Sequence, residues 1–107
     1  ESKTWAEAQA ACQKLGGGLV SIQSAEEQDF LTSLTKASNS YAWIGLTDIN
    51  TEGTWVWTDG SPVNYTNWAP GEPNNRGNKE DCVEIYTDGN KWNDEPCGSK
   101  LPYVCEF

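Results

Sequence analysis

The order of the elements expected from the sequence predicts a protein of the α+β class. Two capped helices occupy the first third of the 107-residue chain with one short strand between them, and further strands follow. Helices and strands that are segregated along a chain are typical of this class, whereas α/β folds alternate them. A chain of 107 residues is short of the size at which proteins split into domains. Residues 1–107 are therefore expected to form a single domain.

The first helix is expected to begin after Thr4. Thr4 and Glu7 fit a capping box, in which each side chain accepts a hydrogen bond from the other residue's backbone amide. Glycines at positions 16–18 end the helical run. Apolar residues that recur at helical spacing predict a core-facing side, made up of Trp5, Ala8, Cys12 and Leu15.

A second capping box predicts another helix. Ser24 and Glu27 have the required spacing, and the helix is expected to continue to about Lys36. The acidic residues at both helix starts complement the helix dipole, so we interpret them as helix-terminal charges and not as ligands. The residues expected to point inward from this helix are Phe30, Leu31 and Leu34.

Short runs of aromatic and β-branched residues predict the strands. Residues 61–81, in contrast, have almost no periodic apolar pattern, and an unstructured loop of about 20 residues is uncommon in a compact domain unless it is functional. Four tryptophans in or beside the strands are interpreted as core residues and not as sugar-stacking platforms: Trp43, Trp55, Trp57 and Trp92. The expected strands are residues 19–22, 41–46, 54–58, 82–86, 91–93 and 103–105.

The composition excludes several partners. A net charge of −9 without histidine argues against binding to nucleic acid or to an anionic membrane surface. No apolar run approaches the ~20 residues that span a bilayer, and no signal peptide is recognisable, so we expect a mature chain or an excised domain. The six tryptophans argue against disorder, because they can build an aromatic core.

The four cysteines predict two disulfides. Cys12, Cys82, Cys97 and Cys105 lie far apart, with no Cys-x-x-Cys pair and no histidine to complete a zinc site. Disulfides imply an extracellular or lumenal protein, and free buried thiols are the alternative. Spacing alone leaves three possible pairings.

Residues 67–94 carry the candidate metal site. Carboxylate and amide oxygens without thiol or imidazole are the ligands that calcium prefers, and calcium accepts about 6–8 of them in a flexible shell. The alternative is an ordinary polar surface loop. The predicted calcium ligands are Glu72, Asn74, Glu80, Asn93 and Asp94.

The sequence resembles a C-type lectin domain, the calcium-dependent carbohydrate-recognition module, over essentially its whole length. The features that carry this resemblance are the helix ending near Cys12 and the motifs Trp43-Ile44-Gly45-Leu46, Glu72-Pro73-Asn74, Glu80-Asp81-Cys82 and Trp92-Asn93-Asp94, followed by Cys97 and Cys105. Residues 67–76 are also similar to the selectin branch. The resemblance implies a C-type lectin fold, in which two short helices flank antiparallel sheets and a long loop holds the calcium. It also implies disulfides Cys12–Cys105 and Cys82–Cys97.

The resemblance further implies a sugar class. In the family, the order Glu-Pro-Asn, here Glu72-Pro73-Asn74, goes with mannose, fucose and N-acetylglucosamine, whose 3- and 4-hydroxyls are equatorial. Each hydroxyl that coordinates calcium still has a proton to donate and a lone pair to fill. We therefore assign Glu72 and Glu80 as acceptors, and Asn74 and Asn93 as donors.

Other polar residues near this stretch have open interpretations. Residues of an auxiliary calcium site in some family members match Asp48, Glu52, Glu80 and Asp81, with Asn75 at a position where a carboxylate is often found; Asp48 and Glu52 are alternatively solvated turn residues. Arg76 and Lys79 either contact an acidic sugar substituent or are solvated charges. Asn64 begins a glycosylation sequon.

The function expected from these features is binding of mannose- or fucose-type glycans by an extracellular lectin in cell adhesion or innate recognition. The alternative is a protein-interaction module of the same fold. We do not expect an enzyme, because the carboxylates are interleaved with amides at a metal-ligand spacing and not isolated as a catalytic pair. Weak binding at a single site predicts that the domain belongs to a larger or clustered protein.

Overall fold

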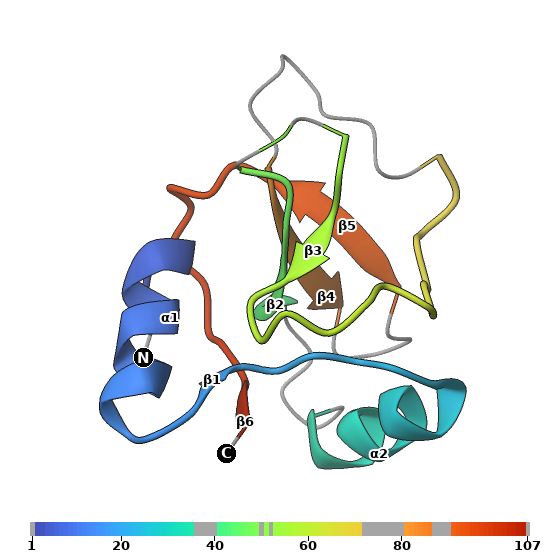
Figure 1. Ribbon diagram of the computed structural model, residues 1–107. Coiled ribbons are helices and arrows are strands. Elements are labelled where there is room, and N and C mark those ends of the chain that lie inside the picture. Colours follow the sequence, from blue (N-terminus) through green and yellow to red (C-terminus); the bar gives the residue numbers. More distant parts are fainter. Residues whose placement is uncertain are drawn as a thin grey trace.

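The computed structural model describes residues 2–35, 41–49, 51, 53–71, 81–86 and 91–106, without the side chains of residues 34 and 35. A four-stranded sheet lies in the middle, with helix α1 on one side and helix α2 on the other (Figure 1). Within the described ranges, no helix is long and apolar enough to cross a membrane. The elements are α1 (Trp5–Lys14), β1 (Gly18–Leu19), α2 (Ala25–Thr35), β2 (Tyr41–Thr47), β3 (Val56–Trp57), β4 (Cys82–Tyr86), β5 (Trp92–Glu95) and β6 (Cys105–Glu106).

The strands form two antiparallel sheets. The larger sheet has the order β3-β2-β4-β5, and β1 pairs with β6 in the smaller one. In the larger sheet Tyr41 lies opposite Tyr86, and Glu84 lies opposite Asn93. β4 lies between β2 and β5, so it joins β5, which carries the Trp92-Asn93-Asp94 motif, to the centre of the sheet.

Helix α1 begins where predicted, but its buried side includes one residue fewer than predicted. The Thr4 hydroxyl and the Glu7 carboxylate form the capping box, and Gly16 has a φ of 98° after the helix. Trp5, Ala8 and Cys12 are buried, but Leu15 is the C-cap residue and is 71% exposed. The prediction for Leu15 was wrong because the chain leaves the helical spiral there.

Helix α2 shows a similar difference. Ser24 caps it by accepting from the amide of Glu27, whereas the Glu27 carboxylate accepts from the amide of Gln23. Leu31 is buried as predicted, but Phe30 is 66% exposed, and the side chain of Leu34 lies outside the described residues. The prediction for Phe30 was wrong because, among the described side chains of α2, the helix buries the side that carries Gln28 and Leu31.

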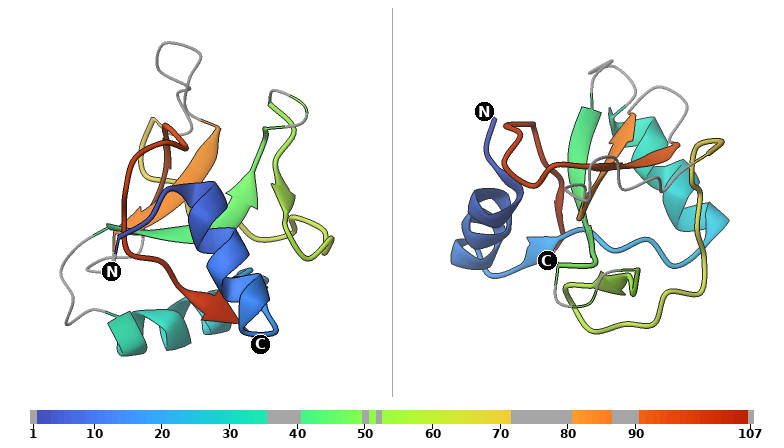
Figure 2. Two further views of the ribbon diagram at one scale, coloured as in Figure 1. Left: turned by 90° about the vertical axis from the view of Figure 1, so that its left-hand side faces the viewer. Right: turned by 90° about the horizontal axis from the view of Figure 1, so that it is seen from above.

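Two core clusters occupy the two faces of the large sheet. One joins α2 to the sheet through Leu31, Ile44, Ile85 and neighbouring residues. The other joins α1 to the sheet through Trp5, Cys12 and Trp43, and the view from above shows the two helices on opposite sides of the sheet (Figure 2). Trp43, Trp57 and Trp92 are buried, and Trp55 packs partly buried against the first cluster, so the four tryptophans are core residues as predicted.

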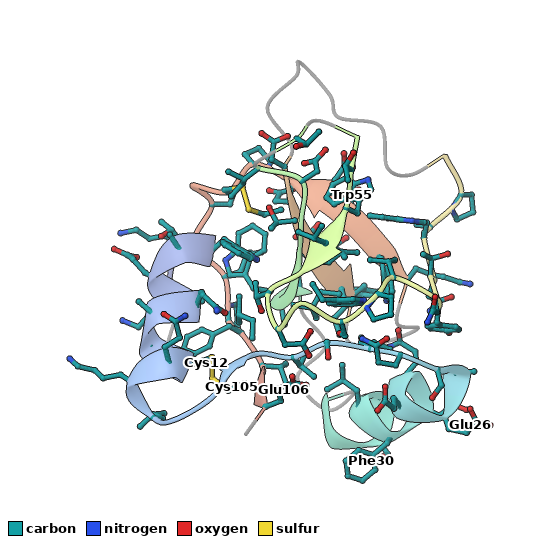
Figure 3. All side chains as sticks on the ribbon, in the orientation of Figure 1. Cys12, Glu26, Phe30, Trp55, Cys105 and Glu106 are labelled. Atoms are coloured by element: carbon teal, nitrogen blue, oxygen red, sulfur yellow. A yellow bond between two sulfur atoms is a disulfide. The ribbon has the colours of Figure 1, made fainter. Side chains whose placement is uncertain are left out.

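The observed disulfides are Cys12–Cys105 and Cys82–Cys97, as the family resemblance implied. Their Cα atoms are 5.5 Å and 5.2 Å apart, and the first bridge ties α1 to β6 (Figure 3). In the loop-entropy model, closures of about 93 and 15 residues stabilise a fold by about 4.7 and 3 kcal/mol. The second bridge also fixes the start of β4 to the segment that follows β5.

Several strands are shorter or shifted relative to the prediction. β1 ends at Leu19, because the backbone amide of Val20 donates to the carbonyl oxygen of Val104 outside the regular hydrogen-bond ladder. β3 contains two residues only, and β6 begins at Cys105, while Tyr103 makes an isolated bridge to Trp43. β4 agrees with its prediction, and residues 61–71 of the predicted loop contain no helix or strand apart from a bridge at Trp68.

Candidate metal and sugar site

Strand β5 carries two of the predicted ligands on opposite faces of the sheet. Asp94 lies opposite Val83 and is fully buried, as is Trp92 two residues earlier. Asn93 lies opposite Glu84 and is partly buried. The alternation follows from the strand geometry, in which successive side chains point to opposite faces. The strand therefore directs the Asn93 amide and the Asp94 carboxylate to opposite faces of the sheet.

A buried carboxylate orients the amide of Asn93. Nδ2 of Asn93 donates to Oε2 of Glu84 at 2.7 Å, and Glu84 is only 5% exposed. Because a carboxylate accepts hydrogen bonds and cannot donate them, the group of Asn93 that faces Glu84 must be the amide nitrogen and not the carbonyl oxygen. The Asn93 carbonyl oxygen is thereby directed away from Glu84, as a metal ligand requires.

The start of the long loop is fastened to the same strand. The amide of Trp92 donates to the carbonyl of Asn67 at 2.9 Å, and the amide of Ala69 donates to the carbonyl of Trp92 at 2.8 Å. The rings of Trp68 and Trp92 meet edge to face, with centroids 5.7 Å apart. Residues 67–69 thus form a strap along β5, directly before the Glu72-Pro73-Asn74 motif.

The end of the long loop is fastened to the turn after β2. The amide of Asp48 donates to the carbonyl of Asp81 at 3.0 Å, and Oδ2 of Asp48 accepts from the amide of Gly53 at 2.8 Å. Oδ1 of Asp81 is buried, and no described residue hydrogen-bonds to it. Two acidic residues therefore lie side by side where the long loop ends.

Four of the predicted ligands lie in the described part of the chain. Asn93 and Asp94 follow one another on β5 with side chains on opposite faces of the sheet, and a backbone hydrogen bond joins Asp48 to Asp81. Among the described residues, no group of three or more acidic, cysteine or histidine side chains could hold a metal ion. Asn64 is exposed, so its glycosylation stays a prediction. The predicted residues that lie outside the described ranges are Glu52, Glu72, Asn74, Asn75, Glu80, Arg76 and Lys79.

The residues present fit calcium in their chemistry. All the predicted ligands are oxygen donors, and the buried oxygen of Asp81 would otherwise be desolvated without compensation. The residue that the sequence reasoning missed is Glu84. Alternation along residues 82–86 and the hairpin signal at Asp88-Gly89 would have placed it on the same face as Asn93.

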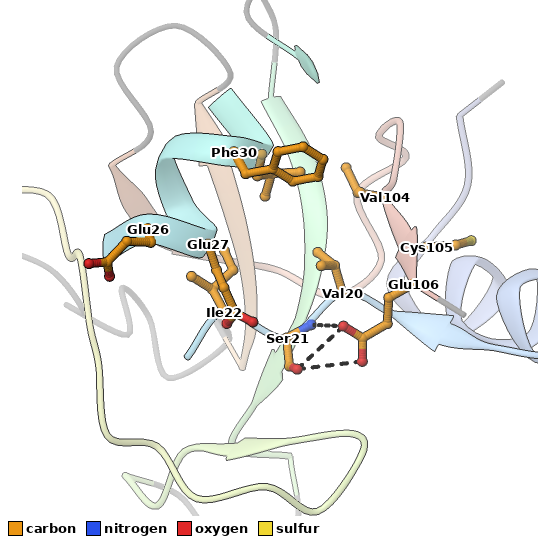
Figure 4. A pocket seen from close by; sticks show the side chains of 10 residues that line it. Val20, Ser21, Ile22, Glu26, Glu27, Phe30, Val104, Cys105 and Glu106 are labelled. Carbon is orange, nitrogen blue, oxygen red and sulfur yellow. Dashed lines mark hydrogen bonds between the residues drawn. The ribbon is translucent and has the colours of Figure 1, made fainter. Parts of the chain in front are cut away.

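A separate apolar pocket lies between α2 and β6 (Figure 4). On its rim, the amide of Ser21 donates to Glu106 at 3.1 Å, and the Ser21 hydroxyl donates to Oδ2 of Asp59 at 2.9 Å and lies 3.4 Å from the Glu106 carboxylate oxygens. Burial, together with the nearby Asp59 carboxylate, raises the pKa of Glu106 above its usual range. Hydrogen bonds from Ser61 lower the pKa of Asp59. None of these residues is a predicted ligand.

The fold is an α+β domain with two antiparallel sheets, two helices and the disulfides Cys12–Cys105 and Cys82–Cys97. The sequence matches the model of the Lectin C-type domain over residues 1–107. The chain belongs to the C-type lectin domain family, which confirms the resemblance and the fold inferred from the sequence. This places it among lectins and not among enzymes.

Relatives and solved structures agree with this assignment. The chain is 55% identical over 106 residues to the low affinity immunoglobulin epsilon Fc receptor of Mus musculus and 47% identical over 105 residues to pulmonary surfactant-associated protein D of Bos taurus. It is covered to 98% in both comparisons and spans 31% and 28% of those relatives' lengths. It also matches the cow CD23 carbohydrate-recognition domain, solved in the presence of a GlcNAc2Man3 oligosaccharide, with a TM-score of 0.89 and 50% identity over 97% of this chain and 79% of that one.

Proposed function

We propose that residues 1–107 form a single carbohydrate-recognition domain that binds mannose-, fucose- and N-acetylglucosamine-type glycans in the presence of calcium. The observation that carries this proposal is the pairing of Asn93 with Glu84 on a strand to which the long loop is strapped. That arrangement would pre-organise the amide of Asn93 as a ligand, and the strapped segment precedes the Glu72-Pro73-Asn74 motif in the sequence. The oligosaccharide present with the cow CD23 domain supports the sugar class.

The residues that would hold calcium are Glu72, Asn74, Glu80, Asn93 and Asp94. Calcium, when bound, supplies coordination positions for two neighbouring sugar hydroxyls. The protein's part is to complete the hydrogen bonds of those hydroxyls. Glu72 and Glu80 accept their protons, and the amide groups of Asn74 and Asn93 donate to their remaining lone pairs. Asn93 has two amide protons, so it can donate to Glu84 and to a sugar at the same time.

An auxiliary cation at the base of the loop is part of the proposal. Asp48 and Asp81, joined by a backbone hydrogen bond, would hold it with Glu52, Asn75 and Glu80. Its role would be to hold the end of the long loop to the turn after β2. The buried Asp81 oxygen supports this assignment.

A second candidate function is recognition of a protein. One relative that is 55% identical is named an immunoglobulin Fc receptor, so a domain of this fold can belong to a protein-binding receptor. We favour the sugar site because all five predicted ligand positions are occupied by oxygen donors. For either function we propose an extracellular setting, where the two disulfides persist.

The first experiment is retention on immobilised mannose and on immobilised galactose, each with millimolar calcium and again with EDTA. Retention on mannose that requires calcium supports the proposal. Retention on neither resin, with calcium binding still measurable by calorimetry, favours the protein-binding alternative.

A double substitution tests the donor and acceptor roles. Glu72→Gln with Asn74→Asp exchanges an acceptor and a donor without changing the net charge. We expect the variant to shift its preference toward galactose in the same column assay. An unchanged preference for mannose would contradict the assignment of these two residues.

A further inference from the structure

A buried glutamine on α2 contacts the strand that carries two predicted ligands. Gln28 is only 2% exposed, and its carboxamide oxygen accepts a hydrogen bond of 2.7 Å from the indole Nε1 of Trp92 on β5. The two residues are 64 positions apart in the sequence, so the bond is a tertiary contact between the helix and the strand. Asn93 and Asp94 follow Trp92 directly on β5. Gln28 itself is none of the predicted ligands.

The hydrogen bonds of Gln28 are incomplete. Its amide nitrogen is buried, and no described residue accepts a hydrogen bond from it. A buried donor without a partner destabilises a fold. A glutamine is therefore an unfavourable residue at this position if α2 only has to pack against the sheet. What Gln28 supplies, and an apolar residue would not, is an acceptor that orients the Trp92 indole.

Trp92 connects α2 to the segment that leads into the long loop. Its fully buried indole meets the rings of Trp57, Tyr65 and Trp68 edge to face, at centroid distances of 5.6, 6.0 and 5.7 Å. Its backbone donates one hydrogen bond to the strap of residues 67–69 and accepts another from it. Because the interior is closely packed, a rotation of the indole would displace Tyr65 and Trp68 and with them the strap.

We propose that Gln28 is a positioning residue for the calcium site. By holding the Trp92 indole in one orientation, it fixes the backbone of β5 and the strap, and it thereby raises the affinity of the site for calcium. Asp94 is buried on the same face of β5 as Trp92, since side chains two residues apart on a strand share a face. The inference rests on the proposed function, because it concerns ligands of the proposed calcium site.

The first test measures the calcium affinity of Gln28→Met by calorimetric titration. Methionine is flexible and unbranched like glutamine, but its thioether is only a weak acceptor. We expect calcium to bind about 2- to 30-fold more weakly, the range for residues that affect a site without touching its ligand. In the Trp92→Phe background, which lacks the indole donor, Gln28→Met should have little further effect. Equal effects in the two backgrounds, or none in either, would overturn the role of this hydrogen bond.

Two control variants separate positioning from stability. Gln13→Met makes the same substitution at an exposed position of α1. Ala8→Gly weakens α1 in the other core cluster and should lower the midpoint of denaturant unfolding in EDTA. Both controls should keep the calcium affinity of the wild type. Equal losses of calcium affinity in Gln28→Met and Ala8→Gly would assign the effect to stability and overturn the proposal.

A second measurement needs no variant. Coupling is reciprocal, so calcium must strengthen the hydrogen bond between Gln28 and Trp92 if that bond strengthens calcium binding. Exchange of the Trp92 indole proton with solvent is followed by NMR in calcium and in EDTA. The reference is the indole proton of Trp43, which donates to the carbonyl of Lys3 just before α1. We expect calcium to slow exchange more at Trp92 than at Trp43, and equal slowing would overturn the proposal.

Failure of this inference is distinguishable from failure of the proposed function. Binding of methyl α-mannoside to the wild type is titrated in saturating calcium, and thermal unfolding in EDTA checks that each variant is folded. Calcium-dependent mannoside binding with unchanged calcium affinity in Gln28→Met overturns the positioning role alone. Weaker calcium binding by Gln28→Met, in a protein that binds no mannoside, supports the positioning role and refutes the sugar assignment. Absence of calcium binding by the wild type refutes both.

Discussion

Replacing Glu84 by alanine is expected to weaken calcium binding about 10- to 100-fold, the usual cost of losing a group that orients a metal ligand. The structure supports this magnitude. The hydrogen bond from Asn93 to the buried Glu84 carboxylate is 2.7 Å long, and a bond to a charged partner contributes about 1.5–3 kcal/mol. Without it, the Asn93 amide can turn its nitrogen toward the cation. The affinity is measured by calorimetric titration with calcium.

Two control variants distinguish orientation from charge. Glu84→Gln removes the charge and keeps an acceptor for Asn93, so it should retain most of the affinity. Glu26→Gln makes the same charge change on the exposed start of α2 and should have little effect. Thermal unfolding in EDTA shows whether Glu84→Ala remains folded. Equal calcium affinity in wild type and in folded Glu84→Ala would refute the role of Glu84, and equal losses in the alanine and glutamine variants would assign it to charge alone.

Two further predictions concern the stability of the fold. A Cβ at Gly45 would lie 2.8 Å and 3.1 Å from the carbonyl oxygens of Leu19 and Val20, so Gly45→Ala should destabilise the protein by about 1–3 kcal/mol, as overpacking does. Gly98→Ala is the control, because a Cβ at Gly98 meets no atom within 4 Å. Equal denaturant midpoints for the two variants would contradict the close approach of the backbone carbonyls to Gly45. The raised pKa of Glu106 predicts a pH effect, because the folded state holds that proton more tightly than the unfolded state. Stability contributed by the protonated group is lost as pH rises from about 4.5 through the folded pKa, so Glu106→Gln should gain stability relative to wild type across this window. Denaturant unfolding of both proteins from pH 4 to pH 8 checks this. If the difference in their free energies of unfolding does not change with pH, burial beside Asp59 and the pocket residues Glu26 and Glu27 does not perturb the pKa of Glu106.

Much of the fold could be predicted from local sequence signals. The Thr4 capping box and the glycines after α1 determine where that helix begins and ends, because these interactions involve residues three or four positions apart. Alternation predicts β4 in the same way. The family motifs supplied the disulfide pairing, which spacing alone had left open.

Side-chain exposure was less predictable at the ends of elements. Leu15 and Phe30 are apolar and lie at helical spacing, yet both are exposed, because no other segment covers them in the described structure. The length of a strand depends in the same way on the strand with which it pairs. β3 contains two residues because it pairs with β2 at two positions.

For the candidate site, the sequence by itself determined which atoms are available: oxygen donors at five positions, two of them neighbours on a strand. Only the tertiary structure decided what surrounds them. The strap of residues 67–69 along β5 and the contact of Gln28 with Trp92 join segments far apart in the chain. Such contacts depend on strand register, which is set by packing of the whole sheet and not by any local preference.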